Sequence, residues 1–407
     1  MKFLIISQVF WPDSTAVSQY LTDLAEELVE KGHDVSVVSS RRQYERPEKR
    51  FSAKELHRGV RIQRIAQTGF GKRYVVGRVL DFLSFNINLF RKLLTVRKGT
   101  YDVVIGLTAP PLVSFIGALL AGRKGMQFAY WAMDLQPELS IAAGYLKRGS
   151  LVAKTLSYFG DTIYRRADRI VALDSYMATQ IIRRTGDESR IGVIPLWPAV
   201  GEVYTGSRMD NPFRRDQGLG GRFVIMYSGN HSVVHPLDTI LRVAWLLRED
   251  SRFLFLFIGG GVRRGDVSAF QEKHGLTNVR QLSYQPREDI HLSLGAADLH
   301  LVILGNGCAG FCHPSKVYGA MFIGRPVLYI GPRQSHVADL LAECPGNLQA
   351  SHGASDSLVQ DLRAFADLPE IERARIGAAN REYVLQRFTR QRLCGRLINT
   401  LEGMAPN

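Results

Sequence analysis

Short apolar runs alternate with segments of helical periodicity along this 407-residue chain, and this alternation constrains its fold more than any other feature. Residues 2–7 (KFLIIS) have the continuous apolar character of a buried parallel strand. Apolar residues then recur at helical spacing from Leu21 to Leu28, and Gly32 ends that segment. Because residues 34–39 (DVSVVS) are the next apolar run, the pattern predicts a βαβ unit with a right-handed crossover.

The alternation continues through the first half, stops over residues 197–221 and then restarts. Residues 197–221 are rich in Gly, Pro and Asp and lack a period, which is typical of a linker between domains. The remaining runs predicted as strands are residues 102–107, 126–132, 169–173, 191–195, 223–227, 253–258, 279–282, 299–304 and 326–330. Further helices are expected from Pro236, from about Asp266, and over residues 287–296 and 370–402. We therefore predict an α/β fold of two Rossmann-like, doubly wound parallel-sheet domains, residues 1–196 and 222–380.

The net charge of +14 is concentrated in the first half of the chain. Residues 1–200 hold 29 Lys and Arg against 18 Asp and Glu, a surplus of 11, whereas residues 201–407 hold 23 against 20, a surplus of 3. A basic half favours an anionic partner, which is a nucleic acid, an anionic membrane or a phosphorylated substrate. No nucleic-acid-binding motif accompanies the basic residues, so nucleic acid is not an expected partner.

Four unevenly spaced cysteines do not form a disulfide framework, which favours a reduced, cytosolic setting. Cys308, Cys312 and His313 form one tight cluster that supplies three ligands at most, so a zinc site is not expected. Residues 1–6 (MKFLII) are too short for a secretory signal. A Pro-Pro pair divides the apolar stretch 103–121 into a strand and a buried helix, each too short to cross a bilayer.

Ligands of doubly wound sheets bind beyond the carboxyl ends of the strands, so the residues that follow each strand are candidates for a binding site. The turn SGNHSVVHP follows one strand of the second half, and its Gly229 and Asn230 allow a tight turn. The turn GGGVRRG follows the next strand and contains Gly260 and Arg263. Free backbone N–H groups in such turns can hold a phosphate. The alternative, that the glycines serve only the geometry of the turns, stays open.

The stretch GFCHPSKVYGAMFIGRPVLYIG places Lys316 at the start of a short helix. The backbone at a helix start is already positive, so this lysine weakens the local structure unless an anion binds there. Ser315 is expected to cap the helix. Because the turn follows an apolar strand and a glycine-rich run, we interpret Lys316 as a diphosphate ligand rather than as a solvated lysine.

Two loops after strands of the first half also carry candidate residues. The loop QVFWPDSTAVSQ contains Trp11 and Ser14, and the segment WAMDLQPE contains Asp134 and Glu138. Asp134 is expected to accept a proton from an attacking hydroxyl group, or to orient it. The alternative for Asp134 is a role as a helix-capping or turn residue.

The chain resembles the GT-B glycosyltransferases of family 4, the retaining group that uses nucleotide-activated sugars. The resemblance covers nearly the whole chain and rests on the order and spacing of FLIISQVFWPD, LAEELVEKGHDVSVVS, YSGN, FLFIGGG, NVRQLSYQPREDI, AADLHLVIL and PSKVYGAMFIGRPVL. It is greatest with the bacterial members that build exopolysaccharide, capsule or O-antigen units, which carry the same PSK turn. REYVLQRFTRQ is similar to the start of the family's last helix, here residues 381–407, which returns to the N-terminal domain.

The resemblance implies a GT-B fold in which the first domain binds the acceptor and the second binds a nucleotide-sugar, with a cleft between them. It implies that Lys316 and the turns at Gly229 and Gly260 contact the donor diphosphate and that Asp134 faces the acceptor. Lys316 and Asp134 are the candidate catalytic residues. The candidate donor-binding residues are Gly229, Asn230, Gly260, Arg263, Tyr284, Ser315 and Lys316, and the candidate acceptor-side residues are Trp11, Ser14, Asp134 and Glu138. Many members have two glutamates eight positions apart, but Phe311 and Gly319 occupy those positions here, so recognition of the donor ribose is unassigned.

Lys316 and helix N-termini are expected to stabilise the leaving diphosphate, so no metal and no other cofactor is expected. The expected acceptor is a saccharide or a lipid-linked saccharide of bacterial surface polysaccharide biosynthesis. Residues 72–98 mix basic and apolar side chains, which favours docking on an anionic membrane over an ordinary packed helix. The protein would then be peripheral on the inner face of the cell membrane. Two alternatives stay open: a GT-B sugar-nucleotide epimerase, and a non-catalytic nucleotide-sugar-binding partner of a polysaccharide assembly complex.

Overall fold

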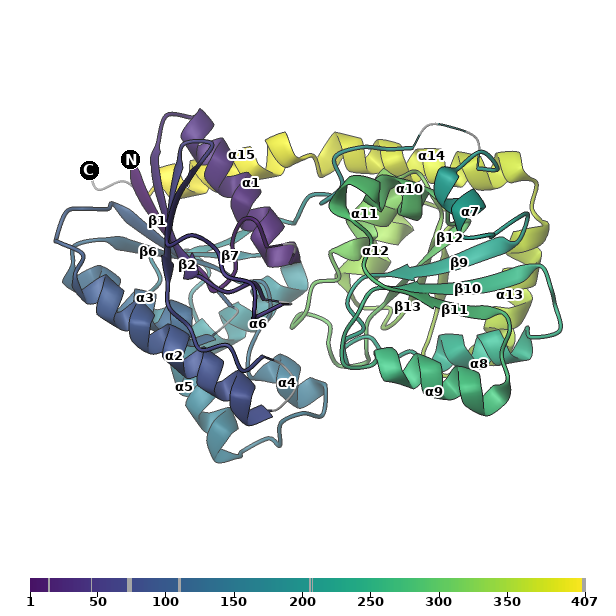
Figure 1. Cartoon of the computed structure of the whole chain (residues 1–407), viewed down its shortest axis with the longest axis horizontal. Helices are drawn as coiled ribbons and strands as arrows, with labels where there is room; N and C mark the ends of the chain where they lie inside the picture. Colours follow the sequence, from purple (N-terminus) through teal and green to yellow (C-terminus); the bar gives the residue numbers. More distant parts are fainter. Residues whose placement is uncertain are drawn as a thin grey trace. The chain divides into compact units, whose positions relative to one another are not determined.

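The computed structural model (Figure 1) describes the chain except for residues 14, 45, 72–74, 109–110, 205, 207 and 405–407. The chain divides into two units. Unit 1 comprises Met1–Leu196, Gly310–His313 and Arg390–Asn407, and unit 2 comprises Trp197–Ala309 and Pro314–Thr389. Each unit is built on its own largely parallel sheet, so the predicted α/β class is confirmed.

The described residues of unit 1 form an eight-stranded sheet in the order β3-β4-β2-β1-β5-β6-β7-β8. Its strands are β1 (Lys2–Ile6), β2 (Asp34–Ser40), β3 (Lys54–His57), β4 (Val60–Ile65), β5 (Val103–Leu107), β6 (Gln127–Trp131), β7 (Arg169–Ala172) and β8 (Ile191–Val193). β1 pairs in parallel with both β2 and β5, and four of its five residues are buried, as predicted from its apolar sequence. β3 runs antiparallel to β4 at one edge.

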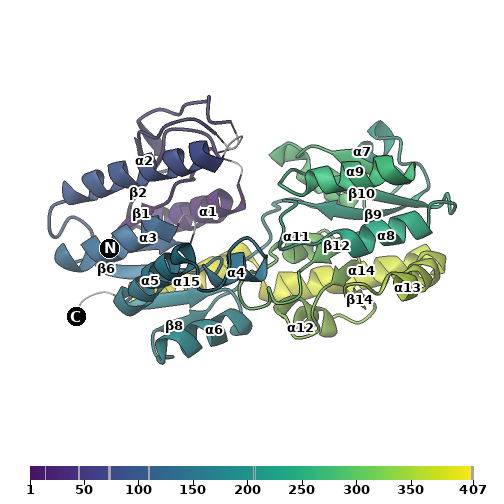
Figure 2. The same cartoon turned by 90° about the horizontal axis from the view of Figure 1, so that it is seen from below.

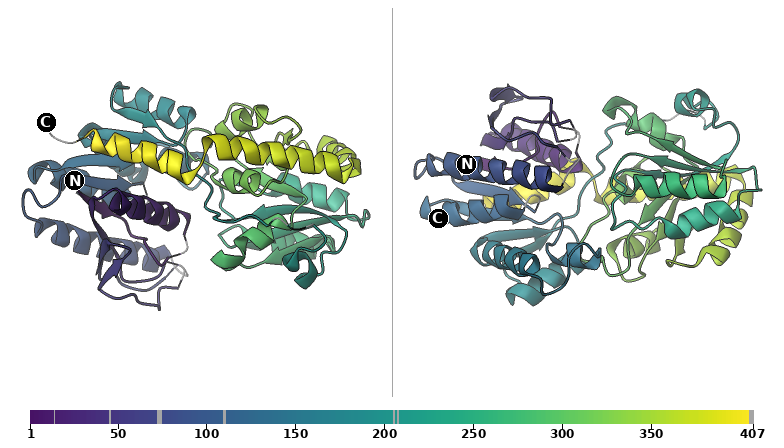
Figure 3. Two further views of the ribbon diagram at one scale, coloured as in Figure 1. Left: turned by 90° about the horizontal axis from the view of Figure 1, so that it is seen from above. Right: turned by 60° about the horizontal axis from the view of Figure 1, so that its bottom comes forward.

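Helices cover both faces of the unit 1 sheet (Figure 1). They are α1 (Ala16–Glu30), α2 (Val75–Leu94), α3 (Pro111–Arg123), α4 (Glu138–Ala142), α5 (Leu151–Arg166), α6 (Ser175–Thr185) and α15 (Arg390–Glu402). Helices α2, α3 and α5 lie side by side, with α3 packed against the other two (Figure 2). Helix α15 packs on α1 (Figure 3), where the Arg390 guanidinium lies 3.1 Å from Asp23 and 3.5 Å from Glu26.

The described residues of unit 2 form a six-stranded sheet in the order β11-β10-β9-β12-β13-β14. Its strands are β9 (Phe223–Ser228), β10 (Phe253–Ile258), β11 (Val279–Leu282), β12 (Leu299–Ile303), β13 (Val327–Ile330) and β14 (Leu348–Ala350). Every pairing between them is parallel. The parallel arrangement brings the carboxyl ends of all these strands to one edge of the unit.

The unit 2 sheet has a core on each face because successive side chains of a strand point to opposite sides. Phe223 and Tyr227 belong to a core with α8, α9 and α13, whereas Val224 and Met226 belong to a core with α7 and α10. Figure 1 shows these two groups of helices on opposite faces of the sheet. The helices of unit 2 are α7 (Pro212–Asp216), α8 (Asp238–Leu246), α9 (Arg264–His274), α10 (Ile290–Gly295), α11 (Lys316–Phe322), α12 (His336–Ala342), α13 (Ser355–Asp367) and α14 (Glu370–Arg387), and a 3₁₀ turn (Arg287–Asp289) precedes α10.

Residues 197–221, predicted as a linker, belong instead to unit 2. Phe213 and Leu219 are buried in one of its cores. The Arg214 guanidinium is also buried, donates a hydrogen bond to the Ala296 carbonyl at 2.6 Å and lies 3.2 Å from Asp298. These contacts fix a segment that has little periodicity because it contains only one short helix among its described residues.

Residues 370–402, predicted as a long helical stretch, form two helices, α14 and α15, which are separated at Phe388 and Thr389. Helix α14 belongs to unit 2 and α15 belongs to unit 1. The final segment, predicted as residues 381–407, therefore contains the end of one helix and the whole of the next.

Candidate functional site

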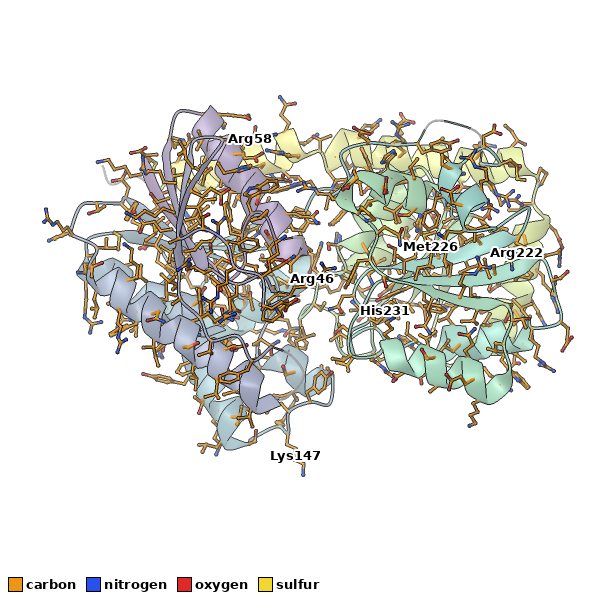
Figure 4. All side chains as sticks on the ribbon, viewed as in Figure 1. Arg46, Arg58, Lys147, Arg222, Met226 and His231 are labelled. Atoms are coloured by element: carbon orange, nitrogen blue, oxygen red, sulfur yellow. The ribbon has the colours of Figure 1, made fainter. Side chains whose placement is uncertain are left out.

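Three turns that follow strands of unit 2 are bonded to one another. The Gly229 amide donates to the Ile258 carbonyl at 2.9 Å, and the His231 amide donates to the Gly260 carbonyl at 2.7 Å. The Gly305 amide, just after β12, donates to the Val234 carbonyl at 2.8 Å. Figure 4 shows His231 beyond the end of β9 and Arg222 at its start. The predicted turns at Gly229 and Gly260 are thus parts of one structure at the carboxyl edge of the sheet.

Two glycines of the β10 turn are required by close contact with the β9 turn. Gly259 has φ 131°, and a Cβ added to it would lie 2.1 Å from the Gly229 carbonyl oxygen. Gly261 has φ 126°, and a Cβ there would lie 2.3 Å from Asn230 Oδ1. The geometry of the turns alone therefore accounts for Gly259 and Gly261, because any side chain at either position would separate the two turns. This is the alternative that the sequence left open. The φ angle of Gly260 does not require a glycine, and the group nearest to a Cβ added there would be the Tyr284 ring.

Lys316 projects its ammonium group onto the β9 turn. The Nζ atom is buried and lies 3.7 Å from the centre of the Tyr227 ring, an attractive cation–π arrangement. A Cβ added to Gly229 would lie 3.6 Å from the same Nζ atom. Tyr227 is held in place because its hydroxyl donates to the Asn230 carbonyl at 2.7 Å. The structure thus brings together Lys316, Gly229 and Asn230, which are separate in the sequence.

The prediction that Ser315 caps α11 is wrong. Its backbone has φ −59° and ψ −19°, and its side chain makes no capping hydrogen bond. A side chain caps a helix from an extended backbone, whereas Ser315 is already helical. The first amides of α11 instead bond tightly back along the chain, from Val317 to Pro314 and from Tyr318 to Ser315, each at 3.2 Å.

The other two predicted donor residues occupy the rim of the same turns. Tyr284 is 53% exposed, and its ring carbon Cε2 would lie 3.1 Å from a Cβ added to Gly260. The Arg263 amide donates to the His231 carbonyl at 3.0 Å. Its guanidinium forms an ion pair with Asp266 and lies 3.7 Å from Asp238. Part of the charge of Arg263 is therefore already balanced by carboxylates.

His231 is a member of this site that the sequence reasoning missed. It is 1% exposed, and its Nδ1 atom lies 3.1 Å from the Gly260 carbonyl. Burial, opposed by this hydrogen bond and helped by the charge of Lys316, lowers the pKa of His231 to about 4. The imidazole is therefore neutral at pH 7. Its position in the turn SGNH after a buried strand is the feature that could have identified it.

Asp134 lies in unit 1, in the loop after β6. The Thr108 hydroxyl accepts hydrogen bonds from the amides of Met133 at 2.9 Å and Asp134 at 3.3 Å. Burial raises the pKa of Asp134 to about 6, although a hydrogen bond from Cys312 and the charge of His313 act in the opposite direction. At pH 7 the group is mostly ionised and has the pKa of an effective general base.

Glu138, predicted on the acceptor side, begins α4 and is engaged in an ion-pair network. The Arg184 guanidinium lies 2.7 Å from Glu138 and 2.6 Å from Asp161. Tyr130 is near both Glu138 and Asp134: burial raises the pKa of Tyr130 to about 12, and the two carboxylates add to this rise. The end of β6 therefore carries two acidic groups in one neighbourhood, of which Glu138 is neutralised by a partner.

Trp11, the next predicted acceptor residue, stacks on the His57 ring with centroids 4.3 Å apart and planes 20° apart. Its carbonyl accepts a hydrogen bond from Arg64 at 2.7 Å. These contacts fix Trp11 within unit 1. Ser14 lies outside the described residues.

Comparisons with known proteins agree with this architecture. Residues 15–197 match a family model described as a glycosyl transferase 4-like domain. A probable glycosyltransferase WbjE of Pseudomonas aeruginosa is 26% identical over 311 residues, which cover 75% of this chain and 75% of that protein. A putative colanic acid biosynthesis glycosyl transferase WcaI of Escherichia coli (strain K12) is 22% identical over 414 residues, which cover 99% of this chain and 100% of that protein.

A solved structure similar to this one is that of Anabaena HepE in complex with UDP and glucose. It superposes with a TM-score of 0.72 at 14% identity, covering 99% of this chain and 100% of that chain. At this identity the likeness shows the fold, and the predicted GT-B fold is confirmed. Among the described residues, no helix combines the length and apolar character needed to cross a bilayer.

Proposed function

Residues 15–197 match a glycosyl transferase 4-like domain, and the chain has the GT-B fold. We propose that the protein is a retaining glycosyltransferase that takes its sugar from a nucleotide-sugar. The observation that carries the proposal is the convergence of the Lys316 ammonium on the Gly229 turn at the carboxyl edge of the unit 2 sheet. Support comes from the relatives named as glycosyltransferases and from the similar HepE structure, which contains UDP and glucose.

The donor diphosphate would bind to unit 2. When the bond between the sugar and the diphosphate oxygen breaks, negative charge develops on the leaving diphosphate. His231 is neutral at pH 7 because burial lowers its pKa to about 4, and Arg263 is paired with carboxylates. Lys316 is therefore the cation on which the proposal relies, together with backbone N–H groups of the turns. We propose that this stabilisation suffices without a metal.

The acceptor hydroxyl would bind to unit 1 at Asp134. The attacking oxygen loses its proton as it bonds to the sugar, and a carboxylate with a pKa of about 6 can take that proton at neutral pH. Thr108 supports this role because its hydroxyl holds the backbone amide of Asp134. Glu138 keeps Arg184 as its partner and would form a charged border to the acceptor site.

We also propose that the acceptor is lipid-linked and that α2 docks on an anionic membrane as part of bacterial surface polysaccharide biosynthesis. Helix α2 buries one apolar face, which includes Phe85 and Leu89, as the alternative interpretation expected. A second apolar stripe on the same helix remains exposed, formed by Val76, Val79, Leu80, Leu83, Ile87, Phe90 and Leu94. Arg91 and Lys92 lie in its last turn. An exposed apolar stripe beside basic residues fits an anionic interface.

A test of this function measures binding and turnover separately. A thermal-shift panel of UDP-, GDP-, ADP- and dTDP-sugars identifies the donor, because a ligand that binds the native state raises the apparent stability. Transfer is then assayed with and without lipid-linked saccharide acceptors. Acceptor-dependent release of nucleotide with an unchanged anomeric configuration supports the proposal. Conversion of the donor sugar without an acceptor indicates an epimerase, and binding without turnover on any acceptor indicates a non-catalytic partner.

A further inference from the structure

A four-residue segment between β12 and α11 belongs to a different unit from the residues that flank it. Gly310–His313 is part of unit 1, whereas Ala309 and Pro314 are part of unit 2. The chain thus leaves unit 2 for four residues, returns to it, and begins α11 with Lys316 two residues later. We call Gly310–His313 the strap.

The strap pairs with the loop that carries Asp134. The Leu135 amide donates a hydrogen bond to the Phe311 carbonyl at 2.8 Å, and Asp134 and Cys312 form an isolated antiparallel bridge. The Cys312 side chain is also hydrogen-bonded to the Asp134 carboxylate. Asp134 is therefore held by the strap through both its backbone and its side chain.

The strap is anchored at its other end by a buried pair of side chains. His313 Nδ1 lies 2.7 Å from Asp174 Oδ2, and both side chains are almost completely inaccessible to solvent. Asp174 also caps α6, because its Oδ1 accepts a hydrogen bond from the Met177 amide at 2.7 Å. One carboxylate thus joins the strap to the start of a helix, which restricts the movement of both.

We propose that the strap positions the carboxylate of Asp134 for the acceptor hydroxyl, with Cys312 as the donor to that carboxylate and the His313–Asp174 pair as the anchor. The proposal rests on the proposed function, because it gives Asp134 its role. Cys312, His313 and Asp174 are positioning residues: none needs to touch the substrate.

The groups that face Asp134 come from several elements, and each affects its charged form. The Cys312 hydrogen bond and the charge of His313 lower the pKa of Asp134, while burial raises it. Tyr130 on β6 lies close enough for the charge of Asp134 to raise the pKa of that phenol, and Thr108 holds the Asp134 amide. Removing the Cys312 donor therefore raises the pKa of Asp134 further.

The first test measures that titration directly, without substrate. The Asp134 carboxyl carbon is followed by ¹³C NMR in aspartate-labelled protein, assigned by its absence in Asp134→Asn. Cys312→Ala raises the pKa of Asp134 by about half a pH unit, the size expected for one weak hydrogen bond. Cys312→Ser keeps a donor, and the pKa of Asp134 stays at or below its wild-type value because an O–H is a stronger donor than an S–H. Cys344→Ala, a change to a buried cysteine outside the strap, leaves the titration of Asp134 unchanged. Identical titration of Cys312→Ala and wild type overturns the proposal whether or not the protein transfers sugar.

The second test separates positioning from folding. Asp174→Ala removes the anchor, and kcat falls about tenfold while the donor dissociation constant stays within about twofold. Asp174→Asn keeps an acceptor for His313 and recovers part of kcat. Equal losses of kcat in both variants, or loss of donor binding in parallel with kcat, contradict the strap. A wild-type protein that is inactive with every acceptor contradicts the proposed function alone, since the NMR titration still decides the role of Cys312.

Discussion

The Lys316 ammonium lies over the face of the Tyr227 ring, 3.7 Å from its centre, and against the Gly229 turn. A lysine at the first position of a helix is unfavourable for that helix, and here its charge is directed toward the edge where the turns of three strands meet. This position suits a bound anion. The lysine that is unfavourable for its own helix is therefore placed where the proposed leaving diphosphate would bind.

Replacing Lys316 removes the charge that would stabilise the leaving diphosphate. We expect Lys316→Ala to lower kcat about a hundredfold or more, the usual effect of losing one preorganised transition-state contact. Steady-state kinetics with the identified donor measure this. Lys273→Ala, at an exposed lysine in the last turn of α9, is the matched control and keeps wild-type kcat. Comparable activity of the Lys316 and Lys273 variants would remove Lys316 from the mechanism.

Gly259→Ala separates the β9 and β10 turns, because its Cβ would lie 2.1 Å from the Gly229 carbonyl oxygen. We expect donor affinity or kcat to fall about a hundredfold through misplacement of the turn. Gly395→Ala is the control: it lies inside α15 of unit 1 with nothing within 4 Å of the added Cβ, so it leaves nucleotide binding unchanged and stabilises the protein by about 0.5–1 kcal/mol. Calorimetric titration with nucleotide measures the donor affinity of both variants. Unchanged binding in Gly259→Ala would show that the turns do not hold the donor.

The pH profile of kcat tests the proposed role of Asp134 as the base. Burial raises the pKa of Asp134 to about 6, and the base form must be present for it to take a proton. We therefore expect kcat to be constant above about pH 7 and to fall about tenfold per pH unit well below 6. Asp134→Asn loses this acidic limb together with most of its activity. An acidic limb that persists unchanged in Asp134→Asn would assign it to another group.

Asp134 also makes stability depend on pH. Because its pKa is raised in the folded protein, from 3.8 to about 6, the folded state binds the proton more tightly than the unfolded state. Protonated Asp134 therefore stabilises the folded state at low pH. As pH rises from about 4 to about 6 this stabilisation is lost, and the free energy of unfolding falls by about 1–3 kcal/mol. Urea titrations of wild type and Asp134→Asn at pH 4.5 and 7.5 measure this. Relative to wild type, we expect Asp134→Asn to raise the free energy of unfolding more at pH 7.5 than at pH 4.5. An equal difference between the two proteins at both pH values would contradict the burial of the charge.

A substitution that adds one negative charge tests whether the exposed apolar stripe of α2 docks on a membrane. Ile87 is 52% exposed, and Ile87→Glu adds a charge that an anionic interface repels. We expect about tenfold weaker binding to phosphatidylglycerol-containing vesicles at low salt, measured by flotation. Ile371→Glu makes the same change on α14 of unit 2, at a residue that is 74% exposed, and leaves binding unchanged. Equal flotation of the two variants and wild type would exclude α2 from membrane docking.

The central strands could be predicted because a strand buried on both faces is a continuous apolar run, as in β1 and β10. Strands β3 and β4 were not predicted because their more buried residues alternate with more exposed ones, and β14 was not predicted because it has only three residues. The extent of unit 2 was underestimated because buried arginines and scattered apolar residues, such as Arg214 and Phe213, leave no period in the sequence.

The site was predictable where it follows strand order. Gly229 and Lys316 both come after buried strands, and the rule on carboxyl ends places such residues at one edge. Capping by Ser315 depends on backbone angles that the sequence does not reveal. The pair His313–Asp174 joins residues 139 positions apart and has no local pattern at all.

The most direct test of the central claim is a crystal structure of the full chain with the nucleotide-sugar, or its nucleotide diphosphate, selected by the thermal-shift panel. We predict phosphate oxygens about 3 Å from Lys316 Nζ and from backbone N–H groups of the Gly229 turn. Phosphates that bind elsewhere, with Lys316 still resting on Tyr227 and no contact to the ligand, would contradict it.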